Sequence, residues 1–141
     1  MAIAPEIEKL TYRIIGACMK VHTTLGPGCP EEYYQKALEH QFDRDKLSFE
    51  TQKFVPVEFE GVLVGQNYLD FLVEEKVIVE IKSVREFLKV HEFQVIKYMI
   101  ATHIGIALLV NFGNESLVHK RLFPPLKISN SWTEEERKWF R

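Results

Sequence analysis

The sequence predicts one domain of the α/β or α+β class, with its elements in the order αα-βββ-α-ββ and a short helix at the C-terminus. Apolar residues recur at three- and four-residue spacing on both sides of the segment LGPGCP, which indicates two amphipathic helices. Alternating apolar and polar residues between positions 49 and 83 indicate three strands in a meander. A chain of 141 residues with 46% hydrophobic residues suits a single core.

The first helix is expected over residues 5–22, because its apolar residues fall on one face. These residues are Ile7, Leu10, Ile14, Ala17 and Val21. The glycines and prolines of LGPGCP cannot continue a helix. Pro30 suits the first turn of a second helix over 31–47, where Glu31 and Glu32 would lie at the positive end.

The first strand is expected in FETQKFVPVEFEG, followed by a turn between Gly61 and Gly65. The next two strands are expected over 66–73 and 77–83, joined by the tight turn EEK. A helix over 90–103 then precedes a buried strand in GIALLVNFG and an edge strand in ESLVHKRLF. In the tail, Thr133 and Glu136 form a capping-box pattern, which predicts the final helix.

Three charged residues fall in the middle of this predicted sheet. Side chains alternate along a strand, so Glu80 and Lys82 are expected on one face, and Asp70 on the face opposite to Leu69 and Phe71. If EEK is a three-residue turn, Asp70 lies directly across from Glu80. Cβ atoms of such partners are about 4.5 to 5.5 Å apart, and like charges there repel.

Two adjacent carboxylates on an apolar sheet require a cation. Lys82 is one candidate, in a purely structural ion pair, and a divalent metal is the other. Oxygen ligands of this kind favour Mg²⁺ or Mn²⁺ over zinc. A simpler alternative is that Asp70, Glu80 and Lys82 line a solvated sheet face and neutralise one another.

Composition limits the classes of function. The 18 Lys and Arg residues against 20 Asp and Glu residues leave a net charge of −2, so any contact with a polyanion must be local. Cys18 and Cys29 have neither the number nor the spacing of a zinc site or a disulfide scaffold, which fits a reducing cytosol. No segment approaches the roughly 18 to 20 apolar residues of a membrane span. We expect a soluble cytoplasmic protein with no membrane partner.

The pattern D-x₉-E-x-K, formed by Asp70 and Glu80-Ile81-Lys82, resembles the signature of the PD-(D/E)xK nuclease superfamily. Two further motifs and the segment VHTTLGPG are similar to the branch named GxxExxY proteins, in the expected order over about residues 4–123. The motifs are G-x-x-E-x-x-Y at Gly28, Glu31 and Tyr34, and H-x-x-Q-x-x-x-Y at His91, Gln94 and Tyr98. Residues 124–141 form a tail outside the resemblance.

The resemblance implies a restriction-endonuclease-like core, a central mixed sheet flanked by helices, within a single domain over 1–141. It implies a Mg²⁺- or Mn²⁺-dependent nuclease that hydrolyses phosphodiester bonds of nucleic acid, DNA rather than RNA. The implied metal ligands are Asp70, Glu80, the backbone carbonyl of Ile81 and Glu31. Lys82 would orient or activate water and stabilise the phosphorane charge.

The implied substrate contacts are Gln94 and Tyr98, which share one stripe of their helix, and Tyr34, which could equally belong to the core. We expect this helix and the one that begins near Glu31 to cover the face that carries the carboxylates. His91 lacks the spacing of a zinc motif. The same holds for His22, and both are predicted only to support the site from its surroundings.

An alternative function is a catalytically silent nuclease fold that serves as a binding or scaffold subunit of a nucleic-acid-processing complex. The neutral-to-acidic composition and the scattered basic residues favour this alternative. The scattered residues are Arg44, Lys46, Lys53, Lys89, Lys97, Lys120, Arg121 and Lys127. Exposed apolar residues in the WFR tail could also serve a homodimer.

Overall fold

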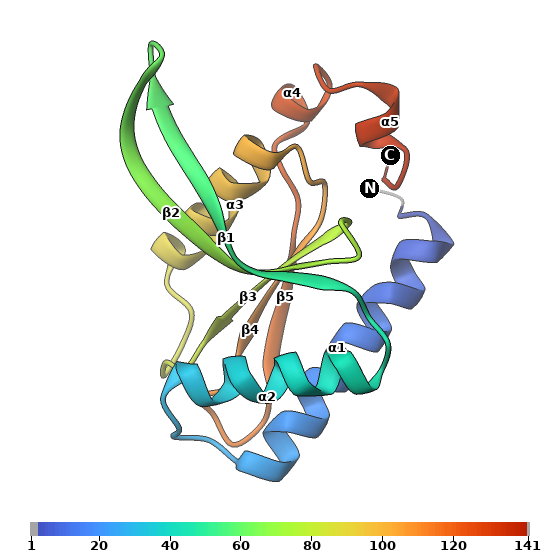
Figure 1. The fold of residues 1–141 in the computed structure, drawn as a ribbon, viewed down its shortest axis with the longest axis vertical. Coiled ribbons are helices and arrows are strands. Elements are labelled where there is room, and N and C mark those ends of the chain that lie inside the picture. The colour runs from blue at the N-terminus through green and yellow to red at the C-terminus, as the bar shows by residue number, and fades with distance from the viewer. Residues whose placement is uncertain (1–2, 141) are drawn as a thin grey trace.

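Five strands form one mixed sheet in the computed structural model, which describes residues 3–140 (Figure 1). The strands are β1 (Phe49–Phe59), β2 (Val62–Val73), β3 (Val77–Lys82), β4 (Ala107–Asn111) and β5 (Val118–Leu122), and they lie in this order across the sheet. All neighbours are antiparallel except β3 and β4, which are parallel. The predicted mixed sheet with flanking helices is confirmed.

Helices cover both faces of this sheet (Figure 1). They are α1 (Pro5–Leu25), α2 (Glu31–Arg44), α3 (Lys89–Thr102), α4 (Leu126–Ser129) and α5 (Glu134–Arg137). The short α4 is absent from the prediction. Helix α1 runs three residues beyond position 22, to Leu25, and it stops there because the following Gly26, with φ of 72°, leaves the helical region. Among the described residues, no helix is both long and apolar enough to cross a membrane.

Two apolar clusters divide between the faces of the sheet. The larger one joins α1 and α2 to β3 through Val77, Val79 and Ile81. The smaller one joins α3 to the opposite face, which carries Ile78 and Leu109. Glu80 lies on this second face, because side chains alternate along β3.

The expectation that α2 covers the carboxylate face is therefore wrong. Tyr34, Leu38 and Phe42 of α2 are fully buried in the larger cluster, on the other side of the sheet. The physical reason is the short loop over 26–30. It turns α2 back beside α1, so the two helices share one face of the sheet (Figure 1).

The β1–β2 hairpin is longer than predicted. Its turn consists of Glu60 and Gly61, with φ of 50° and 80°, the backbone geometry that favours two-residue hairpin turns. Strand β2 therefore begins at Val62, and the expected turn between Gly61 and Gly65 is wrong. The pairing register shifts between Val57 and Glu58, which marks a β-bulge.

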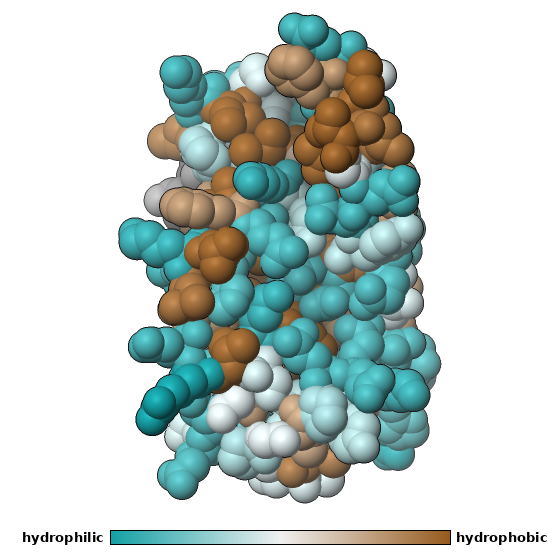
Figure 2. Space-filling model, turned by 90° about the vertical axis from the view of Figure 1, so that its left-hand side faces the viewer, coloured by the Kyte–Doolittle hydropathy of each residue, from teal (hydrophilic) through white to brown (hydrophobic). Residues whose placement is uncertain are grey.

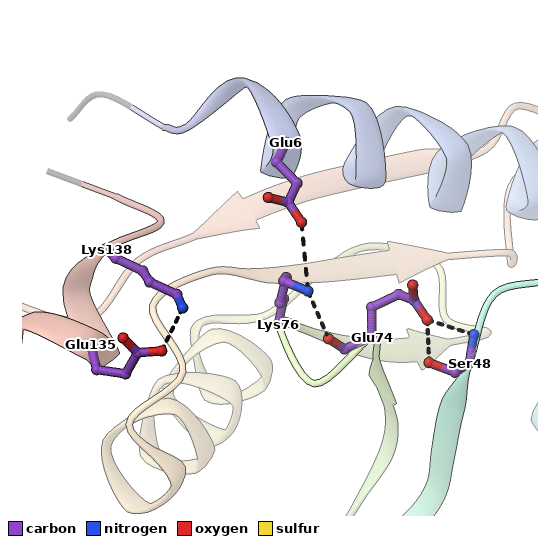
Figure 3. Close-up of polar contacts among 6 residues, drawn as sticks. All are labelled: Glu6, Ser48, Glu74, Lys76, Glu135 and Lys138. Atoms are coloured by element: carbon purple, nitrogen blue, oxygen red, sulfur yellow. Dashed lines mark hydrogen bonds and ion pairs between the residues drawn. The ribbon is translucent and has the colours of Figure 1, made fainter.

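The β2–β3 turn follows the prediction, since Val73 pairs with Val77. Figure 3 shows how the turn is held: the Glu74 carboxylate accepts hydrogen bonds from the amide and the hydroxyl of Ser48, and Lys76 faces Glu6 of α1 at 3.7 Å. The Ser48 hydrogen bonds hold the pKa of Glu74 below its ordinary value. The turn that sets the register of β2 on β3 is thus tied to α1 and to the residue that precedes β1.

The C-terminal segment packs onto the domain. Trp132 and Phe140 are buried, and the ammonium groups of Lys76 and Lys138 both lie over the ring of Trp139. The expectation of exposed apolar residues in the WFR tail is therefore wrong for Trp139 and Phe140, and the last residue lies outside the described part. The capping box of α5 is confirmed by hydrogen bonds between Thr133 and Glu136 in both directions.

Exposed apolar side chains instead gather on the β1–β2 hairpin, which stands out beside α3 (Figure 1). Figure 2 faces this side of the molecule and shows apolar side chains collected at its upper end. The exposed residues of the hairpin are Phe54, Val57, Phe59, Val62, Leu63, Val64 and Tyr68.

Candidate active site

The backbone pairing of β2 with β3 ends at Phe71 and Val79, and two carboxylates lie beyond this point. The amide of Asp70 donates to Oε1 of Glu80 at 2.7 Å, and the amide of Ile81 donates to Oδ2 of Asp70 at 2.9 Å. Each carboxylate thus accepts a hydrogen bond from the backbone of the other strand. The structure therefore brings Asp70 and Glu80 side by side where the two strands separate.

Glu80 is unusual for an acidic residue because only 3% of its surface is exposed. Burial raises the pKa of Glu80 well above its ordinary value of 4.5, and the neighbouring charge of Asp70 raises it further. The Asp70 amide and the charge of Lys82 act in the opposite direction. The site therefore disfavours a full negative charge on both carboxylates unless a cation is added.

Lys82 follows Glu80 on the same face of β3 and is half-buried. Its charge lowers the pKa of Glu80, which places it within electrostatic range of that carboxylate. Among residues 3–140, however, its ammonium group forms neither an ion pair nor a hydrogen bond. The structural ion pair considered from the sequence lacks the contact that it requires.

Helix α3 covers the carboxylates from the side opposite to α2. Tyr98 is buried, and this burial together with the charge of Glu80 raises the pKa of its hydroxyl to about 12. The Gln94 side chain beside the hydroxyl acts in the opposite direction. Tyr98 and Gln94 therefore lie at the site with Glu80, on neighbouring turns of α3.

Gln52 also reaches the site, and the sequence did not point to it. Its amide nitrogen lies 3.2 Å from Oδ1 of Asp70.

Near Asp70 the side chains of β2 no longer alternate regularly between the two faces of the sheet. Leu69 faces α3, whereas Phe71 faces α1 and α2. The expectation that Leu69 and Phe71 share a face is wrong, because Gln52 has a left-handed φ of 47° and the Gln52–Asp70 pair is missing from the ladder.

Of the G-x-x-E-x-x-Y residues, Tyr34 lies on the face of the sheet opposite to the carboxylates. Tyr34 belongs to the core: it stacks on Phe112, donates to the carbonyl of Gly26 and accepts from the amide of Cys29. The side chain of Glu31, the first residue of α2, is exposed and forms no hydrogen bond with a described residue. Tyr34 of this motif therefore holds the two ends of the loop over 26–30 together. The loop also contacts the end of β3, where the hydroxyl of Ser83 donates to the carbonyl of Cys29.

Both histidines have structural partners. The ring of His91 accepts the amide of Leu88 at the start of α3, so it caps that helix. His22 is buried, with Nε2 2.8 Å from the carbonyl of Asn114. Within the described part of the chain, no hydrogen bond joins either ring to Asp70, Glu80 or Lys82.

The donor set suits a hard divalent cation that keeps part of its water shell. Residues 3–140 contain no group of three His, Cys, Asp or Glu side chains that could hold a metal, and Glu31 as a third ligand stays a prediction. Asp70 and Glu80 provide only carboxylate oxygens, and Mg²⁺ is commonly held by one or two of these with water completing its shell. The adjacent backbone carbonyl of Ile81 adds one more oxygen of the right kind.

A family model described as PD-(D/E)XK nuclease superfamily matches residues 8–122. The chain belongs to this superfamily. A search of the curated proteins finds no match. Among solved structures, the chain resembles one titled "Crystal structure of SSO0001", with 17% sequence identity and a TM-score of 0.56. The match covers 71% of this chain and 54% of that chain, so this chain spans about half the length of that protein, and at this identity it shows the fold alone.

Nucleases of the PD-(D/E)XK superfamily act on nucleic acid and generally use Mg²⁺ or a similar divalent metal. The matched residues of this member include Asp70 and the triplet Glu80-Ile81-Lys82, which supply the D and the (D/E)XK of the superfamily's designation in its order, with Leu69 in place of the proline. In this PD-(D/E)XK fold the two carboxylates meet at the end of the β2–β3 ladder, with α3 above them.

Proposed function

We propose that this protein is a nuclease of the GxxExxY branch, which hydrolyses phosphodiester bonds of DNA with Mg²⁺ or Mn²⁺. One observation supports this most strongly: Glu80 is buried directly beside Asp70, and no cationic side chain of the described residues contacts either carboxylate. A buried pair of like charges is costly unless a cation compensates it. A fold that keeps such a pair is suited to take up a cation from solution.

Asp70, Glu80 and the carbonyl of Ile81 would hold the metal. The amide and carbonyl of one strand residue point toward the same neighbouring strand. Because the Ile81 amide donates to Asp70, its carbonyl also faces the β2 side, beyond the end of the backbone ladder. When bound, a divalent cation lowers the pKa of an attacking water and neutralises charge on the scissile phosphate.

Lys82 would contribute electrostatic stabilisation. Its unpaired ammonium lies on the Glu80 side of the sheet, where it can donate to the phosphate oxygens as negative charge builds in the transition state. Tyr98 stays protonated across the physiological range, because its pKa is about 12. Its hydroxyl, with the Gln94 amide, therefore offers neutral hydrogen-bond donors beside the carboxylates.

Basic residues follow the site along the chain. Arg85 and Lys89 lie in or just after the segment that links β3 to α3, and Lys97 lies on α3. All three are exposed, and none of them forms an ion pair with a described residue. By contrast, Lys120 and Arg121 on β5 are paired with acidic residues. Free positive charge is thus available near the site for contacts with the phosphate backbone.

The test is cleavage of labelled single-stranded and duplex DNA and RNA and of plasmid DNA, at saturating Mn²⁺, by the wild type and Lys82→Ala. We expect cleavage of DNA by the wild type. Lys82→Ala should lower kcat by about 10² to 10³, because one positioned electrostatic contact to the transition state is lost. Metal affinity should change little.

Lys127→Ala is the matched control, because Lys127 is an exposed lysine on α4 outside the site. It should cleave like the wild type, and circular dichroism checks that all variants are folded. Equal kcat for Lys82→Ala and the wild type would remove Lys82 from the mechanism. If the wild type cleaved no substrate of the panel, the result would favour the alternative of a catalytically silent binding or scaffold subunit. Cytoplasmic location and a homodimer remain predictions.

A further inference from the structure

Gln52 combines a strained backbone with a contact to a site carboxylate. Six non-glycine residues of the described chain have positive φ, and five of them lie in turns or at helix ends: Lys46, Glu60, Glu74, Glu75 and His103. Gln52 lies within a strand, with φ of 47°. This conformation is unfavourable for a residue other than glycine, and it persists only where the surroundings require it.

The surroundings of Gln52 offer one specific interaction. Its side chain is exposed, so packing does not hold it, and its hydrogen bond goes to Oδ1 of Asp70 at 3.2 Å. The other oxygen of Asp70 accepts from the amide of Ile81 at 2.9 Å. Each oxygen of the carboxylate therefore accepts one hydrogen bond. Together the two bonds restrict rotation about χ2 of Asp70, a torsion that is otherwise broadly distributed.

Both hydrogen bonds are compatible with binding a cation. Each carboxylate oxygen has two lone pairs, so one donor per oxygen leaves one lone pair on each for a metal. A neutral amide also orients Asp70 without neutralising its charge, whereas Lys or Arg in the same place would compete with the cation. Gln52 has the chemistry of a group that orients a metal ligand.

We propose that Gln52 is a positioning residue that orients the Asp70 carboxylate toward a divalent cation, and that the strained backbone of β1 serves this contact. The inference rests on the proposed function in one respect, since it takes Asp70 as a cation ligand. A purely structural role makes a different prediction: the left-handed residue would only redirect the hairpin from α2 toward α3, and its side chain would be irrelevant.

Two substitutions separate these roles. Gln52→Gly removes the amide and relieves the strain, because glycine adopts positive φ freely. Gln52→Met removes the amide but keeps the strain and nearly the same side-chain length. If the side chain positions Asp70, both variants should bind Mn²⁺ more weakly, by roughly tenfold in Kd. Their stabilities should differ, with Gln52→Gly the more stable.

Mn²⁺ affinity is measured by isothermal titration calorimetry on the full chain, and stability by urea unfolding without metal. Lys46→Gly is the matched control, because it also relieves a left-handed residue, with φ of 59°, but lies after α2 and away from the carboxylates. Its Kd for Mn²⁺ should equal that of the wild type. Asp70→Asn should abolish binding and identifies the site.

The outcomes distinguish this inference from the proposed function. Wild-type Kd values in both Gln52→Gly and Gln52→Met, with binding lost in Asp70→Asn, would overturn the positioning role and leave the metal site intact. If only Gln52→Met bound Mn²⁺ more weakly, the effect would come from backbone strain, and this result would also overturn the positioning role of the Gln52 side chain. A wild type that binds no Mn²⁺, or an Asp70→Asn variant that binds it normally, would overturn both proposals.

Discussion

Glu80 is the residue whose chemistry conflicts most with its position. A glutamate on a central strand, with 3% of its surface exposed, loses hydration that one hydrogen bond from a backbone amide and the nearby charge of Lys82 do not replace. The protein retains this group beside a second carboxylate, Asp70. The conflict is local and electrostatic, so it can be tested by removing one charge without changing shape.

Glu80→Gln should stabilise the metal-free protein at neutral pH. Burial and the charge of Asp70 raise the folded-state pKa of Glu80 above its ordinary value of 4.5. Protonated Glu80 therefore contributes its full share of the folding stability below pH 4.5, and this contribution is lost as the pH rises through the folded-state pKa. The Tm difference between Glu80→Gln and the wild type should therefore be small in acid and reach several degrees above that pKa.

Thermal unfolding over a pH series, with and without Mg²⁺, checks this. Saturating Mg²⁺ should raise the Tm of the wild type and leave that of Glu80→Gln nearly unchanged. Glu58→Gln makes the same substitution at an exposed position of the hairpin and should show no pH-dependent gain. A Tm difference that stays constant from acid to neutral pH would contradict the assigned role of the Glu80 charge.

Among the secondary-structure elements, the segment between β3 and α3 determines how the two halves of the site meet. It follows Lys82 directly and leads to the helix that carries Gln94 and Tyr98. Asn111, fully buried at the end of β4, holds this segment: its Oδ1 accepts from the amides of Val84 and Gly113, and its Nδ2 donates to the carbonyl of Val84. One side chain thus fixes the path of the chain between strand and helix.

Asn111→Ala should lower the free energy of unfolding by about 1 to 3 kcal/mol, because it leaves partly buried backbone groups of Val84 and Gly113 without partners. Amides of residues 83–95 should exchange faster with solvent, and kcat should fall because Lys82 and α3 lose their common anchor. Urea unfolding and hydrogen exchange measure these effects. Asn130→Ala, an exposed position, is the control, and equal exchange in both variants would show that Asn111 is not the anchor.

The molecule as a whole places its carboxylate site and its C-terminal segment at opposite ends of β3. At the end away from the site, the segment packs against the β2–β3 turn and the start of β4. Phe140 lies against Gly105 so closely that a Cβ on that glycine would be 1.6 Å from the ring. His103 stacks on Trp132 and contacts Glu136, which attaches α5 to the end of α3. The segment is therefore part of the folded unit, although it lies outside the matched residues.

Gly105→Ala should destabilise the protein by roughly 1 to 3 kcal/mol, because the added methyl group overpacks against Phe140. In a Phe140→Ala background the same change should cost much less, since the clash is gone. A double-mutant cycle in urea measures this coupling. Additive costs would mean that Phe140 does not occupy this position in solution, whereas cleavage and Mn²⁺ binding should persist in every folded variant.

Features that depend on neighbours along the chain were predictable. The core face of α1, the cap of α5 and the strand β3 follow from periodicity and from local hydrogen-bonding chemistry. The approach of Asp70 to Glu80 belongs to the same group, because it needs only the three-residue turn between Val73 and Val77. The register of two strands joined by a short turn is set by a few neighbouring residues, so few other pairings of these strands are possible.

The role of Gln52 depended instead on contacts between distant segments. The turn pairs Phe59 with Val62, so counting along a regular hairpin would put Thr51 opposite Asp70. The bulge near Val57 shifts the pairing of β1 with β2 by one residue, so Gln52 comes opposite Asp70 instead. Likewise, the sequence left Tyr34 open between the site and the core, and the packing of α2 beside α1 decided for the core. A bulge and the side of a sheet that a helix covers are settled by the packing of the whole core, which no local pattern encodes.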